Sequence, residues 1–423
     1  NYAIAYLSPQ DIETMQILKD ASSAAIYGSR AANGVVLITT KQGKKSRGPQ
    51  VSLNASVGLA NVAKTYDVLN AQEYKELMEE IGAVAGIPED IKDETDWFEE
   101  TYKTGINQNY QLSVSNGNEK MRYYIGGGYS DEQGVLKSAY NKRYNVKANF
   151  DSDLYDWLNV GINMAYSHYK NNGIISGQGS NRAGVVLSVI NTPTYAPIWN
   201  PEDPRQYFNN FYGAQNLTSP LENLSRTESN YGQTDRLLLT GEATIKFHKT
   251  LNFKSTVSMD RRWVHNFSFL DPIKSDYGRT QHGYASDERQ DDRRMVYDNI
   301  LTFNNSWNAK HNFEAMAGTS ATTSTWEGLW GERTHFNPDH VIVGLNGGNK
   351  GGLRGNSQSK SQWSIMSFLA RASYNYDSKY YITANLRADG SSKLAPGHRW
   401  GYFPSVSAAW RLSGEDFMEG VTW

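Results

Sequence analysis

Hydrophobic and polar side chains alternate along most of this chain, beginning at Gln50. Apolar residues recur at alternate positions across 144–151, 237–248 and 380–389. Successive residues of a β-strand point to opposite faces, whereas an α-helix repeats every 3.6 residues, so a period of two predicts strands. Each run covers about 9–11 residues, the span of a tilted transmembrane strand, whereas soluble strands are typically about 5–6 residues long.

The connections between these runs fall into two length classes. We count roughly a dozen strands, joined by short turns and long loops, as in an outer-membrane barrel with periplasmic turns and external loops. The short turns are predicted at 152–156, 248–250, 308–310 and 377–379, and the long loops near 171–231, 264–291 and 324–360. Aromatic residues stand at the ends of several runs, as in an interfacial girdle. They are Tyr166, Tyr169, Trp263, Trp307, Tyr380 and Trp410.

The segment before the alternating part has a different pattern. Residues 8–18 combine Ser, Pro and Asp at the start with helical spacing of apolar residues, which predicts a short amphipathic helix. Another helical turn is predicted at 22–27, followed by an Asn-Gly turn at 33–34 and a buried strand at 35–40. This segment is expected to be a compact α/β piece. One further amphipathic helix, at 71–84, interrupts the strands.

Composition narrows the class of protein. The 423 residues carry 42 Lys and Arg against 44 Asp and Glu, a net charge of −2 that argues against a nucleic-acid binder. Cysteine is absent, which excludes disulfides, thiolate metal sites and cysteine nucleophiles. The mean hydropathy of −0.63 is too polar for a helical membrane protein. A soluble β protein and a transmembrane barrel both fit this composition, and the periodicity favours the barrel.

The chemistry-bearing motifs do not assemble a catalytic or metal site. His335 and His340 are five residues apart, and no zinc motif is present. The glycine-rich segment 347–352 lacks the Lys-Ser/Thr pair of a phosphate-binding loop and predicts a flexible external loop. The glycines at 126–128 lie inside a strand, where they indicate a bend or close packing. The mixed charge run 287–294 is interpreted as a solvated loop with ion pairs, with a loop-bound calcium ion as the alternative. We expect no enzymatic activity.

Aromatic residues in the predicted loops are candidates for substrate or lid contacts. Tyr195, Trp199, Tyr207 and Phe208 cluster in the first long loop, together with Phe211 and Tyr212. Trp326 and Trp330 lie in the last one. Exposed aromatics stack on sugar faces or hold peptide side chains. The alternative is that they pack the loops against each other or against a partner.

Two blocks of sequence resemble one family. Residues 18–44, LKDASSAAIYGSRAANGVVLITTKQGK, closely resemble the end of the plug domain of SusC/RagA-type TonB-dependent outer-membrane transporters, with Ala31 where the family commonly has Gly. Residues 372–381, ASYNYDSKYY, and the motifs RADGSSK at 387–393 and RWGYFPSV at 399–406 resemble the mid-barrel consensus of the same family.

The resemblance implies an all-β transmembrane barrel, part of a 22-stranded antiparallel barrel, with the C-terminal piece of an α/β plug domain. We expect residues 1–48 to belong to the plug and residues 49–423 to the N-terminal portion of the barrel, so that the chain is an excerpt of a longer protein. A dozen strands with open edges are not tolerated in lipid, so further strands are expected to follow. The plug signature comprises Lys19, Asp20, Tyr27, Gly28, Arg30, Asn33 and Gly34. These residues either hold the plug fold or help to lock the plug to the barrel, and Gly28 and Gly34 are expected to have positive φ.

The function implied by the resemblance is TonB-dependent import of an oligomeric nutrient across the outer membrane of a diderm bacterium. The implied partners are a SusD-like surface lipoprotein, the TonB–ExbB–ExbD complex, an oligosaccharide or oligopeptide ligand and outer-membrane lipid, but no nucleic acid. No cofactor is implied. The alternatives are a structural or adhesive outer-membrane protein and a passive porin. A soluble β-sandwich enzyme is a weaker one. The framework motifs do not identify the substrate.

Overall fold

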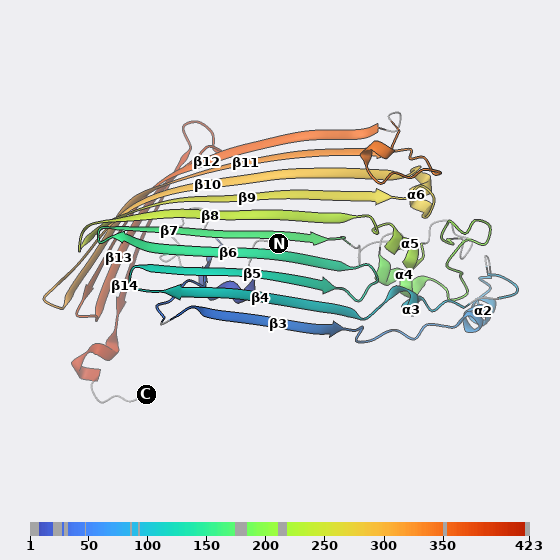
Figure 1. Ribbon diagram of the computed structural model, residues 1–423, viewed down its shortest axis with the longest axis horizontal. Coiled ribbons are helices and arrows are strands. Elements are labelled where there is room, and N and C mark those ends of the chain that lie inside the picture. The colour runs from blue at the N-terminus through green and yellow to red at the C-terminus, as the bar shows by residue number, and fades with distance from the viewer. Residues whose placement is uncertain are drawn as a thin grey trace.

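The alternating part of the chain forms one curved antiparallel sheet (Figure 1). The computed structural model describes residues 8–19, 28, 33–46, 48–84, 87–91, 94–173, 184–209, 218–349 and 353–418. Twelve strands in this part of the chain follow one another in sequence order across the sheet, which confirms the roughly dozen strands predicted. They are β3 (Gln50–Ala60), β4 (Gly105–Gly117), β5 (Met121–Gln133), β6 (Tyr140–Tyr155), β7 (Leu158–Asn171), β8 (Tyr231–His248), β9 (Leu251–Leu270), β10 (Tyr284–Trp307), β11 (His311–Thr334), β12 (Leu353–Tyr376), β13 (Tyr380–Ser391) and β14 (Trp400–Trp410).

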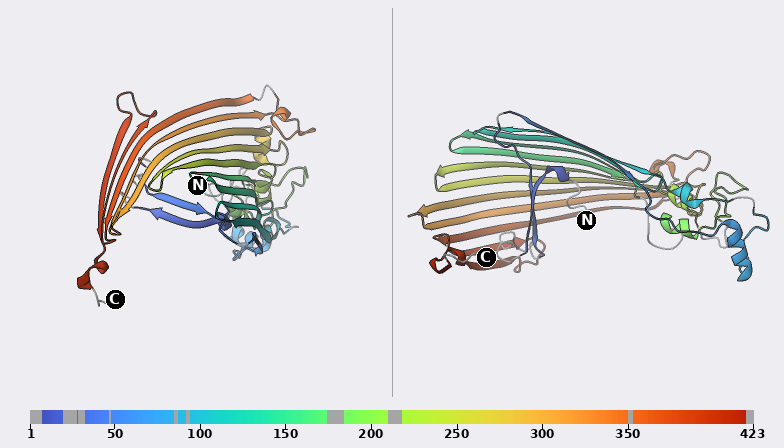
Figure 2. Two further views of the ribbon diagram at one scale, coloured as in Figure 1. Left: turned by 60° about the vertical axis from the view of Figure 1, so that its left-hand side comes forward. Right: turned by 90° about the horizontal axis from the view of Figure 1, so that it is seen from below.

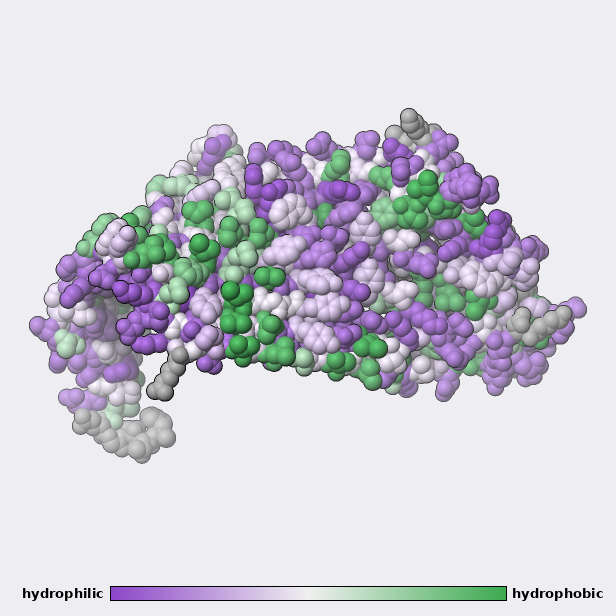
Figure 3. Space-filling view, in the orientation of Figure 1, coloured by the Kyte–Doolittle hydropathy of each residue, from purple (hydrophilic) through white to green (hydrophobic). Residues whose placement is uncertain are grey.

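The polarity of the sheet is the reverse of that in a soluble protein. On β6, Val146 is 45% exposed on the convex outer face, whereas the neighbouring Lys147 is only 4% exposed and points to the concave inner face. Figure 3 shows the outer face, on which many hydrophobic side chains gather over the part of the sheet nearer the short turns. Hydrophilic side chains cover much of the loop end. Apolar residues outside and polar residues inside are the arrangement of a barrel wall in lipid.

Several strands are much longer than predicted. β10, β11 and β12 each have 24 residues. They continue well beyond the hydrophobic part of the outer face near the short turns, which we call the apolar band. The loops predicted near 264–291 and 324–360 are present but shorter than predicted. β9 reaches Leu270 and β10 begins at Tyr284, whereas β11 ends at Thr334 and β12 begins at Leu353. Above the lipid the outer face of the wall carries charged side chains, such as those of Asp287, Arg289 and Asp291, so the hydrophobic alternation fades there although the strand pairing continues. The long loop at 171–231 is confirmed.

The segment before the sheet contains a hairpin on the concave side (Figure 2). β1 (Ile12–Leu18) pairs antiparallel with β2 (Val35–Thr40), after a short 3₁₀ helix, η1 (Pro9–Asp11). The strand at 35–40 is confirmed, but the helix predicted from Ile12 to Leu18 is wrong, because pairing with β2 outweighs the local helical spacing. The turn of helix predicted at 22–27 lies outside the described residues.

Short helices lie in the connections at the loop end of the wall. They are α2 (Ala71–Glu80), α3 (Trp97–Thr101), α4 (Val185–Asn191), α5 (Pro220–Ser225), α6 (Asp276–Thr280) and the 3₁₀ helix η3 (Leu345–Gly347). Two further 3₁₀ helices, η5 (Leu412–Gly414) and η6 (Asp416–Met418), follow β14 at the opposite end of the wall (Figure 1). α2 confirms the helix predicted from residue 71. It begins with a reciprocal capping box between Asn70 and Glu73.

None of the helices in the described ranges is long and apolar enough to cross a membrane.

Candidate functional site

The hairpin segment is attached to the inner wall by polar contacts. Asp11 is buried, and its Oδ1 accepts hydrogen bonds from the Tyr124 hydroxyl at 2.6 Å and from Nε2 of Gln111 at 3.3 Å. Further along, the carbonyl oxygen of Lys41 accepts a hydrogen bond from Nδ2 of Asn149 at 2.8 Å. Tyr124, Gln111 and Asn149 all belong to barrel strands and point inward. The plug piece is thus held by inward side chains of β4, β5 and β6.

The second anchoring point involves the predicted plug signature. Gly28 has φ +67°, and any Cβ there would clash with Arg387 and Asp389 of β13. These two barrel residues are almost fully buried and paired, with Arg387 Nε 2.7 Å from Asp389 Oδ1. Gly34 has φ +90°, so the predicted positive φ is confirmed at both glycines. Only a residue without a side chain fits at Gly28, because the backbone lies directly against the ion pair.

Among the other signature residues, the structure describes Lys19, Asn33 and Gly34. Lys19 is exposed just after β1, and Asn33 is exposed in the turn before β2. Asp20, Tyr27 and Arg30 lie outside the described residues. The part of the signature that the structure places against the barrel is therefore Gly28.

The aromatic cluster predicted in the first long loop serves mainly to pack that loop. Tyr195 is almost fully buried, and Phe208 packs in the same hydrophobic cluster. Trp199 stacks on Tyr207 with ring centroids 4.4 Å apart and still keeps 44% of its surface exposed. Burial raises the pKa of Tyr207 to about 12. Of the four candidates, Trp199 presents the most surface to a ligand.

Trp326 and Trp330 do not lie in a loop. Both are on β11, an even number of residues from Thr322 and Ser324, which are buried on the inner face. They therefore point to the same face. The prediction of a loop position is wrong because β11 continues beyond the apolar band. Their indoles belong to the wall of the lumen, and Nε1 of Trp326 donates a hydrogen bond to Oε1 of Gln290 at 3.4 Å.

A cavity of about 330 Å³ lies on the same inner wall, and motif reasoning missed it. Its lining comes from four consecutive strands and points to the lumen throughout. The lining residues are Ser167, Tyr169, Asn171, Gly232, Thr234, Arg236, Arg262, Val264, Asn266 and Gln290. The sequence does contain one indication of this cavity. Arg236 and Arg262 stand at the polar positions of the alternating pattern, which face the lumen.

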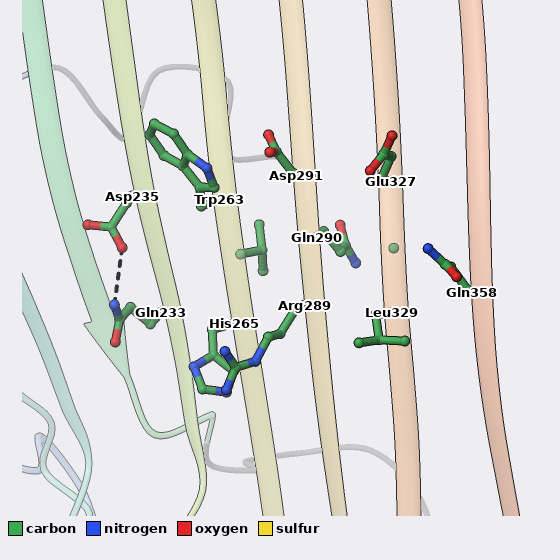
Figure 4. A pocket seen from close by; sticks show the side chains of 12 residues that line it. Gln233, Asp235, Trp263, His265, Arg289, Gln290, Asp291, Glu327, Leu329 and Gln358 are labelled. Atoms are coloured by element: carbon green, nitrogen blue, oxygen red, sulfur yellow. Dashed lines mark hydrogen bonds between the residues drawn. The ribbon is translucent and has the colours of Figure 1, made fainter.

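A second cavity, of about 390 Å³, opens on the outer face of the wall (Figure 4). There Gln233 donates a hydrogen bond to Asp235 at 3.1 Å, and His265 Nε2 lies 3.1 Å from Asp287 Oδ2. Trp263 and Arg289 lie on neighbouring strands. This cavity is above the apolar band and faces away from the lumen, so it is not on a path through the barrel.

The charge run 287–294 belongs to this region, and its interpretation as a loop is wrong. It lies within β10, whose alternation sends Asp291 outward to pair with Arg261 and Asp292 inward to pair with Arg262. Within the described ranges, no group of three or more His, Cys, Asp or Glu side chains could hold a metal ion.

Comparisons with known proteins give the following matches. No family model matches the chain. The chain is 27% identical to the TonB-dependent receptor SusC of Bacteroides thetaiotaomicron over 99% of its own length and 42% of that protein. It is 30% identical to the TonB-dependent receptor P3 of Formosa agariphila over 97% of its own length and 40% of that protein. The chain thus spans about two fifths of the curated relatives it matches.

Solved structures show the same fold. The RagAB peptide importer in its 'open-open' state matches with a TM-score of 0.83 at 24% identity, over 98% of this chain and 50% of that chain. The unliganded ferric citrate transporter FecA matches with a TM-score of 0.53 at 6% identity, over 95% of this chain and 47% of that chain.

Proposed function

We propose that this chain, a homologue of the SusC-type TonB-dependent receptors, is part of an energised importer of an oligomeric nutrient across the outer membrane of a diderm bacterium. Its sequence matches such receptors over nearly its whole length, as the resemblance predicted. The relatives are named as receptors rather than as enzymes.

The observation that carries the proposal is the plug piece held against the lumenal wall. Asp11, Gly28 and Lys41 contact inward side chains of four different strands. A passive porin needs no such obstruction, whereas a pump that opens on demand does. The contacts are polar and individually modest, at about 1 kcal/mol for the hydrogen bond to the Lys41 carbonyl and about 1.5–3 kcal/mol for each bond to the Asp11 carboxylate, so work applied from the periplasm can displace them.

The proposed mechanism has two states of the plug. An oligosaccharide or oligopeptide is captured at the loop end, beneath a SusD-like lipoprotein, and the TonB–ExbB–ExbD complex then displaces part of the plug with energy from the proton-motive force. Substrate binding alone shifts the equilibrium only by its differential affinity for the two states, and TonB supplies the remaining work. The RagAB complex, whose fold this chain shares, is named a peptide importer, which supports an oligomeric substrate.

The test is made on the full-length receptor in its own outer membrane. Deleting the TonB box should abolish uptake of a labelled substrate and leave binding at the cell surface unchanged. An adhesin of this fold would show binding but no TonB-dependent flux at any stage. A passive porin would show the same flux with and without the TonB box, and this result would refute the proposal.

A further inference from the structure

We infer that the lumenal cavity between β7 and β10 is a subsite for the anionic group, a carboxylate or a sulfate ester, of an acidic oligosaccharide. The inference rests on the proposed function, because it assigns the substrate class of that same importer. It concerns a part of the inner wall in the half of the strands nearer the long loops.

The register of the strands places the basic side chains of the wall side by side. Ser167, Arg236, Arg262, Asp292 and Trp326 are consecutive cross-strand partners and form one row across five strands. The next row toward the short turns contains Asp260, Arg294, Ser324 and Trp363 in the same way. Residues on adjacent rows and strands are diagonal neighbours about 7–8 Å apart, within reach of long side chains.

The two rows hold more positive charge than their acidic residues neutralise. Arg236 is fully engaged, with Nε and Nη2 at 2.8 and 2.7 Å from the two carboxylate oxygens of Asp260. Arg262 reaches Asp292 through a single contact of 3.4 Å, and its buried Nε has no hydrogen-bond partner. In the described part of the chain, Arg294 forms no ion pair, although Asp260 lies directly across from it.

A lysine adds to this excess charge at the indole of Trp363. Arg294 and Lys393 each place their cationic group over that ring, at 5.5 and 5.0 Å from its centroid. Two cations on one ring repel each other, and the nearby carboxylate of Asp260 already pairs with Arg236, so a further anion would lower the energy of this arrangement. An anionic ligand group in the cavity above Arg262 would supply that charge and a partner for the orphaned Nε.

The upper rim of the cavity carries amide groups. Asn171 and Asn266 flank Gly232, and a Cβ at Gly232 would lie 3.3 Å from the Oδ1 atoms of both. The cavity is open at this point because the residue between the two amides has no side chain. Amides at the rim and a guanidinium at the floor suit a ligand with hydroxyl groups around one negative charge.

The tryptophans favour an oligosaccharide over an acidic peptide. Trp326 and Trp330 on β11 and Trp363 on β12 are all in the inward phase of their strands, and flat apolar ring faces match the faces of pyranose rings. Gln290 lines the cavity and also accepts the hydrogen bond of Trp326, so the aromatic surface and the polar cavity are continuous. The acidic side chains of a peptide such as hexaglutamate have no comparable flat apolar face to place on these indoles.

Titration calorimetry on the purified full-length receptor tests the inference. The probes are hexagalacturonate, a κ-carrageenan hexasaccharide, maltohexaose and hexaglutamate. We expect one of the two acidic saccharides to bind at least about tenfold more tightly than maltohexaose, because a charge-assisted hydrogen bond contributes about that factor. Hexaglutamate should bind no better than maltohexaose.

Matched variants separate the subsite from general effects on the wall. Arg262→Gln and Arg294→Gln should each weaken the acidic saccharide about tenfold, whereas Arg261→Gln, which changes the neighbouring outward arginine, should have no effect. Gly232→Leu should block the cavity, and Gly241→Leu, at an open outward position on the same strand, is its control.

The binding and uptake results distinguish a failure of the subsite from a failure of the proposed function. The inference is overturned if neither acidic saccharide binds more tightly than maltohexaose, if hexaglutamate binds most tightly, or if Arg262→Gln binds as well as Arg261→Gln. If TonB-dependent uptake persists under these results, the proposed function stands and only the subsite fails. If the subsite behaves as expected and uptake ignores the TonB box, the proposed function fails instead.

Discussion

Neighbouring residues in this wall lie in different environments. Arg261 points outward, where it pairs with Asp291 at 2.6 Å and stacks on Trp263, whereas Arg262 points into the lumen. A shift of one residue exchanges the two faces completely. The side-chain role of any wall residue therefore follows from its phase along the strand, and composition alone cannot supply it.

Glu222 is the titratable residue with the most unusual surroundings outside the wall. Its side chain is fully buried in the loop between β7 and β8, and Oε1 accepts the backbone N–H of Asp276 in α6 at 2.7 Å. Burial raises the pKa of Glu222 to about 7, against the partial opposition of that hydrogen bond and of the charge on Arg279. Arg226 and Asp276 are the other charged groups close enough to act on it.

The contact between these two loops should weaken as pH rises from about 4.5 to 7. In this window Glu222 is protonated while it is buried against α6, and it ionises when the contact with α6 opens and exposes it to water. Forming the contact therefore takes up a proton. Above pH 7 the contact between the Glu222 loop and α6 is weaker by about 3 kcal/mol than below pH 4.5, where this loss is absent. Hydrogen exchange at the Asp276 amide, corrected for its intrinsic rate, measures this directly.

Glu222→Gln is the control for that measurement. The amide keeps an oxygen to accept the Asp276 N–H and cannot ionise, so protection of the Asp276 amide should become independent of pH between 5 and 8. Equal pH dependence in the variant and the parent would show that another group is responsible.

At the scale of the strands, the central question is which face meets lipid. Val257 on β9 is 44% exposed on the outer face, within the apolar band, and its neighbour Ser258 points inward to Thr240. Val257→Arg should destabilise the full-length barrel by about 2–4 kcal/mol, because it places a charge in hydrocarbon. Ser258→Arg places the same charge in the aqueous lumen and should cost much less.

Denaturant unfolding of both variants in lipid vesicles gives the comparison. Equal destabilisation by Val257→Arg and Ser258→Arg would mean that the outer face does not contact lipid.

The same distinction explains what the sequence can predict. Within the apolar band, alternation locates the strands, and the contrast of Val146 with Lys147 identifies their faces. Beyond the band, the pattern carries no information, since both sides of the strands face water, and Trp326 resembles a loop residue. β1 resembles a helix because its partner β2 is distant in sequence and local spacing does not reveal the pairing. The lumenal cavity depends on register across four strands, which no local pattern contains.

The plug segment must move if the protein pumps, and the absence of cysteine in this chain makes that testable. Lys41→Cys with Asn149→Cys, joined by a short cleavable bismaleimide, should tie the plug to β6 and abolish uptake. Cleavage of the linker should restore uptake. The control pair, Thr240→Cys with Ser258→Cys, joins neighbouring strands within the wall and should leave uptake intact. Full uptake with the plug tied would show that this part of the plug stays in place.

At the scale of the whole molecule, the wall, the plug piece and the loops have a defined arrangement. The twelve-stranded wall, apolar outside and polar inside, holds a plug piece near its inner surface and carries packed loops at one end. The cavity with Arg262 lies between those loops and the short turns, on the inner wall.

Energy dependence of uptake tests the central claim most directly. Cells carrying the full-length receptor are given a fluorescent oligomeric substrate, and surface-bound and internal label are measured with and without a protonophore and with and without the TonB box. The account predicts that both treatments abolish internal label while surface binding stays at its original level. Internal accumulation that continues unchanged without the TonB box would contradict it.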